Sequence, residues 1–148
     1  MSSAQTVVTL GDRRAYAAVM GVLLALFLLR VVGQIVVATA APRWLPPMAR
    51  WYSGLMPYRY LLPTQIVFLV VMAVTTLSIA RRSAPLGTMA PAVGTWIIWA
   101  SYAYALGMVV RSVRYASTPP ERRGVLIPIV FHFVLAAFLF TYGRALTR

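Results

Sequence analysis

Four long runs of apolar residues alternate with short polar segments along this chain. The runs cover about residues 15–41, 61–80, 90–110 and 125–143, and a helix of about 20 apolar residues crosses a hydrocarbon core of about 30 Å. The segments between them contain prolines, glycines and arginine pairs, which end helices and favour lipid headgroups. We therefore predict an all-α fold: an integral membrane four-helix antiparallel bundle, with residues 1–148 forming a single transmembrane domain.

Helix-stop signals predict where the helices end. Residues 1–11 are expected to be loosely ordered, and Asp12 is placed to cap the first helix with its carboxylate. Residues 112–124 contain two adjacent prolines and several charges, so an exposed loop is expected there. Gly143 is expected to stop the last helix beside the headgroups.

An antiparallel bundle has two distinct ends. Both termini and the turn at residues 81–89 share one end, which we call end A, and the connections at residues 42–60 and 111–124 share the other, end B. The flanking arginines are nearly balanced between the two ends, so the positive-inside rule hardly discriminates. Arg13 and Arg14 before the first span favour cytoplasmic termini, in a bacterial inner membrane.

The connection at residues 42–60 is rich in proline, tryptophan, tyrosine and arginine. The prolines exclude a regular helix throughout. Tryptophan and tyrosine favour the headgroup zone, where an apolar ring and a polar edge are both satisfied. The segment is therefore either an interfacial aromatic belt or a lid over a pocket, and the two interpretations are compatible. As entrance residues we select Trp51, Tyr52, Tyr58 and Tyr60.

Arg30 is the clearest functional clue, because it lies near the middle of the first apolar run and cannot easily reach either membrane surface. A guanidinium at that depth costs about 2.5–3.5 kcal/mol on insertion scales. The only acidic residues, Asp12 and Glu121, lie outside the spans at opposite ends. The counter-charge of Arg30 is therefore expected to be helix carbonyls, water, a carboxylate of another protein, or the anionic end of a ligand.

Polar side chains from all four runs lie at similar depths below end B. At about 1.5 Å of rise per residue, most fall about 6–12 Å from this end and Arg30 lies about 16 Å from it. The half of the bundle nearest end A is almost purely apolar. We therefore predict a polar cavity that opens toward end B, with candidate ligand-binding residues Arg30, Gln34, Gln65, Tyr102, Tyr104 and His132.

Each of these residues also has a purely structural interpretation. Gln34 and Gln65 can hold helices together through hydrogen bonds, each worth about 0.6 kcal/mol in a membrane. The tyrosines can be packing residues, and His132 can be a buried, hydrogen-bonded histidine.

The third run is rich in small as well as aromatic residues. Ala103 with Gly107, and Ser101 with Ala105, form small-xxx-small pairs, a pattern typical of close helix packing and occasionally of a ligand groove. We expect the third helix to pack closely against a neighbour at these pairs.

Composition narrows the function. The chain is 61% hydrophobic and 11% charged, with a net charge of +12 that arginine alone supplies. Because the arginines flank the spans, they are expected to meet lipid phosphates and not nucleic acid. The absence of cysteine excludes disulfides and thiolate metal sites. No carboxylate and a single histidine lie in the spans, which argues against most enzymes, metal chemistry and proton-coupled transport, so no catalytic or metal-binding residue is assigned.

Together these features predict a small polytopic membrane protein that binds an amphiphilic ligand, such as a phospholipid, a quinone or an isoprenoid, as an accessory or structural subunit of a larger membrane complex. Its expected partners are membrane lipids and another membrane protein or a second copy of the chain. The alternative is a small membrane enzyme or redox subunit that uses His132 with haem or quinone, or a small-molecule transporter. Haem would need a second axial ligand, for which Met20, Met72, Met108 or a histidine of a partner chain are the candidates, and a single histidine gives no haem signature. The cofactor is therefore left open, with quinone or lipid as the candidates and haem disfavoured.

Overall fold

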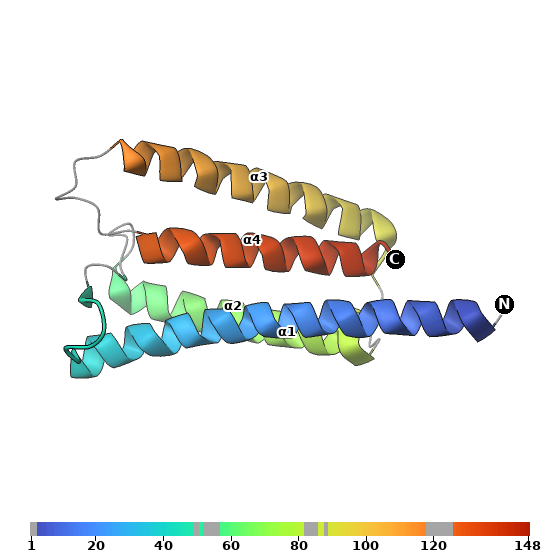
Figure 1. The fold of residues 1–148 in the computed structure, drawn as a ribbon, viewed down its shortest axis with the longest axis horizontal. Helices are drawn as coiled ribbons and strands as arrows, with labels where there is room; N and C mark the ends of the chain where they lie inside the picture. Colours follow the sequence, from blue (N-terminus) through green and yellow to red (C-terminus); the bar gives the residue numbers. More distant parts are fainter. Residues whose placement is uncertain (1–2, 49–50, 52–56, 82–85, 88, 118–125) are drawn as a thin grey trace.

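The computed structural model describes residues 3–48, 51, 57–81, 86–87, 89–117 and 126–148. These residues form four helices and no strand: α1 (Ser3–Ala40), α2 (Tyr58–Arg81), α3 (Pro91–Ala116) and α4 (Leu126–Leu146). All four are long and apolar enough to cross a membrane. Consecutive helices run in opposite directions, so both termini lie at end A (Figure 1). The predicted all-α bundle of four membrane-spanning helices is confirmed.

The helices are longer than predicted. α1 begins at Ser3 and contains Asp12, so the expected loose segment capped by Asp12 was wrong; the Asp12 carboxylate instead lies 3.3 Å from the Arg148 guanidinium. α3 runs to Ala116 and α4 runs past Gly143, so both predicted stops were also too early. Extending an existing helix adds one hydrogen bond for each residue that it orders, which favours continuation where nothing breaks the helix.

Residues 41–45 turn the chain back toward the bundle after α1. Ala41 has a left-handed backbone, with φ of 41°, and its N–H donates to the Val37 carbonyl at 3.2 Å. Glycine is the usual residue here because a β-carbon makes this conformation costly. Pro42 follows, and the residue before a proline is disfavoured in the helical region, so α1 ends at this point.

α4 is the central helix of the bundle. It packs against α3 on one side and α1 on the other, while α2 packs mainly on α1 (Figure 1). α3 lies at the edge, since only 11% of its membrane-crossing window is buried, compared with 39% for α4. α2 and α3 make almost no direct contact, so the bundle is less closed between these two helices than elsewhere.

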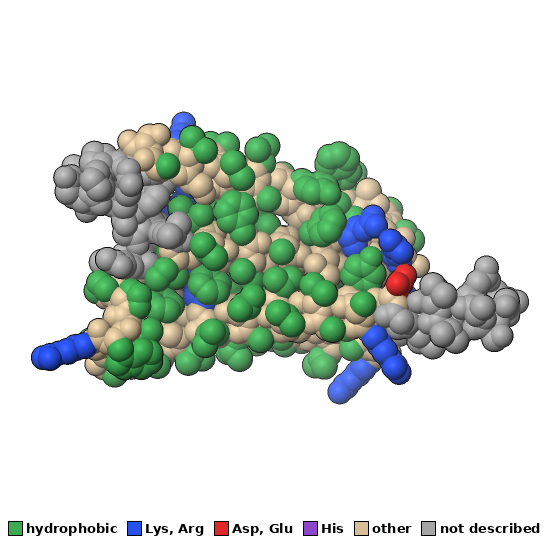
Figure 2. All heavy atoms as spheres, viewed as in Figure 1, with side chains coloured by type: hydrophobic (Ala, Val, Ile, Leu, Met, Phe, Trp, Pro, Cys, Tyr) green, Lys and Arg blue, Asp and Glu red, His purple; other side chains and the backbone are tan. Residues whose placement is uncertain are grey.

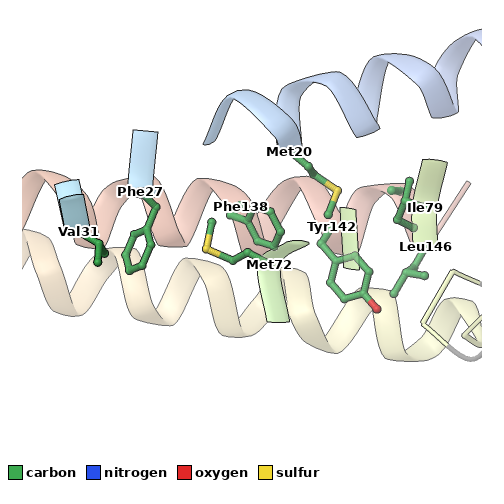
Figure 3. Close-up of a cluster of buried hydrophobic side chains, with 9 residues drawn as sticks. Met20, Phe27, Val31, Met72, Ile79, Phe138, Tyr142 and Leu146 are labelled. Carbon is green, nitrogen blue, oxygen red and sulfur yellow. The ribbon is translucent and has the colours of Figure 1, made fainter. Parts of the chain in front are cut away.

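An apolar core fills the half nearest end A. Met20, Met72 and Ile79 are at most 2% exposed, and they surround Phe138 and Tyr142 of α4 (Figure 3). The face shown in Figure 2 carries apolar side chains along the length of the bundle, and its arginines lie mainly toward the two ends. This distribution is typical of a protein whose flanks face lipid.

Glycines bring α3 and α4 together near end A. A β-carbon on Gly143 would lie 2.8 Å from the Gly94 carbonyl oxygen, and one on Gly94 would lie 2.7 Å from the Gly143 carbonyl oxygen. The predicted close packing at Ala103 and Gly107 was wrong, because both residues are exposed and a β-carbon on Gly107 would meet nothing within 4 Å. Ser101, by contrast, is only 2% exposed.

Candidate functional site

A cavity of about 120 Å³ lies in the half of the bundle nearest end B. All four helices contribute to its wall, and Trp51 adds a side chain from the connection between α1 and α2. Its other apolar lining consists of phenylalanines, leucines and Pro128. The polar lining residues are Arg30, Thr64, Gln65, Tyr104 and His132.

Arg30 is buried beside this cavity, with 7% of its surface exposed. Its Nη1 donates to the Gln34 side-chain oxygen at 3.5 Å, a long hydrogen bond, and its guanidinium carbon lies 5.5 Å from the centre of the Phe131 ring. Its Nε is buried and has no hydrogen-bond partner. In the part of the chain that the structure describes, the only ion pair joins Asp12 to Arg148, so no carboxylate balances the charge of Arg30 there.

Two buried glutamines extend the polar cluster. Gln34 and Gln65 are 0% and 4% exposed, and neither Gln34 Nε2 nor Gln65 Oε1 has a hydrogen-bond partner. Leaving one such buried group unpaired costs about 1–3 kcal/mol. Across the described residues the only other buried, unpaired side-chain atom is Arg13 Nη1, near end A. Arg30 and Gln65 line the cavity, whereas Gln34 does not line it and contacts Arg30. Unpaired polar groups are therefore concentrated in and next to the cavity.

His132 and Tyr104 form a hydrogen-bonded pair across the α3–α4 contact. The Tyr104 hydroxyl lies 2.6 Å from His132 Nδ1, and the two rings meet edge to face. A neutral imidazole has one donor and one acceptor nitrogen. When the tyrosine donates to Nδ1, the proton of the ring is on Nε2, which makes His132 a hydrogen-bond donor through that atom.

Trp51 covers the cavity from the end B side. Its indole is 8% exposed, and its Nε1 donates to the Pro46 carbonyl at 2.9 Å. The ring rests on Gly33 of α1, where a β-carbon would lie 2.8 Å from the ring carbon Cη2. Trp44, seven positions earlier in the same connection, is 79% exposed. The segment therefore supplies both an outward-facing aromatic ring and an inward-facing cover.

The remaining candidate residues lie elsewhere. Tyr102 is 53% exposed on the outer side of α3, where its ring packs beside Phe140, and it does not line the cavity. Two residues along a helix turn the side chain by about 200°, so Tyr102 and Tyr104 face opposite ways. Tyr60 is also exposed, beneath the Arg59 guanidinium. Tyr52 lies outside the described residues, as does the side chain of Tyr58 at the start of α2.

Several cavity residues were not selected from the sequence. Phe27, Phe68 and Phe131 line the cavity, but phenylalanine is common in membrane helices and carries no distinctive signal. Thr64 lies one position before Gln65, and its hydroxyl donates to the Tyr60 carbonyl at 2.8 Å, so its hydrogen bonding is already satisfied. These apolar residues are recognised as cavity residues only because the fold places them around the same cavity as Arg30.

The described residues contain no group of three or more His, Cys, Asp and Glu side chains that could hold a metal ion. Comparison of the chain with known protein families, with curated proteins and with solved structures gives no match.

Proposed function

We propose that this protein binds an amphiphile within the membrane, with the ligand headgroup beside Arg30 and the hydrocarbon part directed to the lipid. The observation that carries this proposal is that Arg30, Gln34 and Gln65 are each more than nine-tenths buried and each retain an unpaired polar atom. A phospholipid, a quinone or an isoprenoid offers an anionic or carbonyl oxygen, which is the acceptor that Arg30 Nε lacks.

Hydrogen bonding supports this proposal. Arg30 Nε and Gln34 Nε2 are donors, and the two residues already lie within 3.5 Å of each other through a different pair of atoms. A ligand oxygen in the cavity that accepts from Arg30 Nε would satisfy a buried group that otherwise costs about 1–3 kcal/mol. Hydrogen bonds to a charged partner are about twice as strong as neutral ones, so an anionic headgroup gains most.

The dimensions of the cavity limit what enters it. A volume of about 120 Å³ is smaller than the 300–1,000 Å³ or so of pockets that enclose a drug-sized molecule. It can hold a headgroup but not a whole lipid. Phe68 lines the cavity and is 43% exposed, so the cavity reaches the outer surface at this side of α2, where a tail can continue into the bilayer.

The test is the ligand content of Arg30→Leu, purified in mild detergent and analysed by native mass spectrometry and lipid extraction. The variant should insert at least as well as the wild type, because an insertion cost of about 3 kcal/mol disappears, and it should lose the copurifying amphiphile. The matched control is Arg59→Leu, which removes an exposed arginine at the same end of the bundle and should keep the ligand. An unchanged ligand complement in Arg30→Leu, together with a lower melting temperature, would show that Arg30 only holds helices together.

The Tyr104–His132 pair favours a second candidate, a small membrane enzyme or redox subunit. A histidine held in one orientation by a 2.6 Å hydrogen bond is suited to proton transfer or to contact with a cofactor. A visible absorption spectrum of the purified protein separates the two candidates: a haem band favours the redox role, and a colourless protein with extractable lipid favours amphiphile binding.

The same native mass spectra address the proposed accessory role. The only carboxylate in the four membrane-crossing helices described is Asp12, at the end of its span. These helices therefore supply few groups for chemistry, and a subunit that holds a lipid for a larger membrane complex needs none. A protein that copurifies with the wild type at a fixed ratio would support this role.

A further inference from the structure

The charge of the cavity selects among anionic ligands, if the proposed amphiphile binding holds. Arg30 contributes one positive charge, and no acidic side chain of the described residues lies near it. A headgroup with a single negative charge balances this site. A phosphate monoester carries about −1.5 to −2 near pH 7, which leaves excess negative charge in a site of low polarity, and a quinone leaves the arginine unbalanced.

The size of the cavity distinguishes between headgroups that carry a single negative charge. A phosphodiester also has one negative charge, but its phosphorus carries two organic substituents, which a wall of phenylalanine, leucine and indole around about 120 Å³ leaves little room for. A carboxylate is planar and ends its chain, so only one substituent must leave the cavity. The partly exposed Phe68 marks an apolar exit for that single chain.

The donor arrangement also suits a carboxylate. Two oxygens in one plane match the fork of an arginine side chain, and Arg30 Nε is the unpaired member of that fork. Rotation of the Gln65 amide by half a turn presents its nitrogen in place of its oxygen. A carboxylate accepts about four hydrogen bonds, so these donors do not exceed its capacity.

We infer that the cavity binds a long-chain carboxylate, with the carboxylate at Arg30 and its single hydrocarbon chain leaving past Phe68. This inference rests on the proposed amphiphile binding and names its ligand class: a fatty acid or another single-chain monocarboxylate.

The experiment is isothermal titration calorimetry on the full chain, stripped of bound lipid by detergent exchange, with four probes: oleate, methyl oleate, farnesyl phosphate and decylubiquinone. Oleate should bind, and methyl oleate, which has the same chain without the charge, should bind at least about tenfold more weakly, as expected for loss of a charged pair worth about 1.4 kcal/mol or more. Equal binding of oleate and methyl oleate would overturn the inference.

Variants separate the site from partition of the probes into detergent. Arg30→Gln should weaken oleate binding at least about tenfold, Arg30→Lys, which keeps the charge but loses the fork, should give an intermediate loss, and Arg59→Gln should change nothing. If Arg30→Gln does not fold, the comparison of oleate with methyl oleate on the wild type decides, because equal binding of the two probes overturns the inference. Arg30-dependent binding of decylubiquinone or farnesyl phosphate without oleate would overturn the carboxylate and leave the proposed function standing. Arg30-independent behaviour of all four probes would overturn both.

Discussion

The two halves of the bundle treat buried polar groups in opposite ways. Toward end A the Thr75 hydroxyl donates to the Val71 carbonyl one turn earlier at 2.8 Å, and the Tyr142 hydroxyl donates to the Leu86 carbonyl at 2.8 Å. Toward end B the guanidinium and amides beside the cavity keep unpaired atoms. A threonine can satisfy itself on its own helix, whereas a guanidinium or an amide carries donors beyond the reach of the local backbone. Apart from Arg13 Nη1, the described polar groups buried in the first half are paired within the bundle, whereas the second half needs a further partner to pair its unpaired groups.

The two halves also differ in packing: the interior is filled toward end A and contains a cavity toward end B. Toward end A the largest fully buried side chains, Met20, Met72 and Ile79, close the interior, and α3 and α4 touch backbone to backbone. Toward end B the interior holds a cavity whose cover is one indole ring from a connecting segment. If the half toward end A is structural and the half toward end B binds a ligand, substitutions toward end A should mainly lower the melting temperature. Substitutions toward end B should mainly change ligand retention.

The largest effect is expected at the α3–α4 crossing. Gly143→Ala places a β-carbon 2.8 Å from the Gly94 carbonyl oxygen, and since backbone cannot move aside, the helices must separate at a cost of up to about 3 kcal/mol. A melting curve in detergent should show a clear loss of stability. Gly107→Ala is the control, because its β-carbon meets nothing within 4 Å, and it should be neutral or stabilising by up to about 1 kcal/mol. Equal melting temperatures for the two variants would show that the close approach of α3 and α4 does not stabilise end A.

A smaller effect of opposite sign is expected at end B. Gln65→Met replaces a buried amide whose oxygen is unpaired with an apolar side chain of similar size, which should raise the stability of the lipid-free protein by about 1 kcal/mol. The measurement is the melting temperature after removal of bound lipid. A fall of similar size would mean that Gln65 stabilises the helix packing and that end B is a hydrogen-bonded core like any other.

The smallest effect on stability is expected where Trp51 meets α1. Gly33→Ala pushes a β-carbon to 2.8 Å from the indole ring, so the ring must shift, and the helix-propensity gain of about 1 kcal/mol offsets much of the cost. The melting temperature should barely change while ligand retention falls. Gly21→Ala on the same helix, where the added carbon has open space, should keep the ligand. Full retention in Gly33→Ala would show that Trp51 is not the cover of a binding site.

The sequence by itself determined the number of helices, their order and the positions of the connections. An apolar run in lipid must satisfy its backbone internally, so a helix is the only form that a single run can take. The constant rise per residue then set the depth of Arg30, Gln34, Gln65 and His132 relative to end B. Helix ends were predicted less well, since Asp12 and Gly143 lie inside helices that continue beyond them.

Only the tertiary structure decided which side chains meet. Residues 102 and 104 are both tyrosines on one helix, yet Tyr104 lines the cavity and Tyr102 faces outward. Of the two tryptophans in the same connection, Trp51 is buried and Trp44 is exposed. In water an apolar pattern identifies the buried face of a helix, but in a membrane the lipid is as apolar as the protein interior. The sequence pattern therefore cannot separate lipid-facing from core-facing positions, and the choice is made by packing between helices.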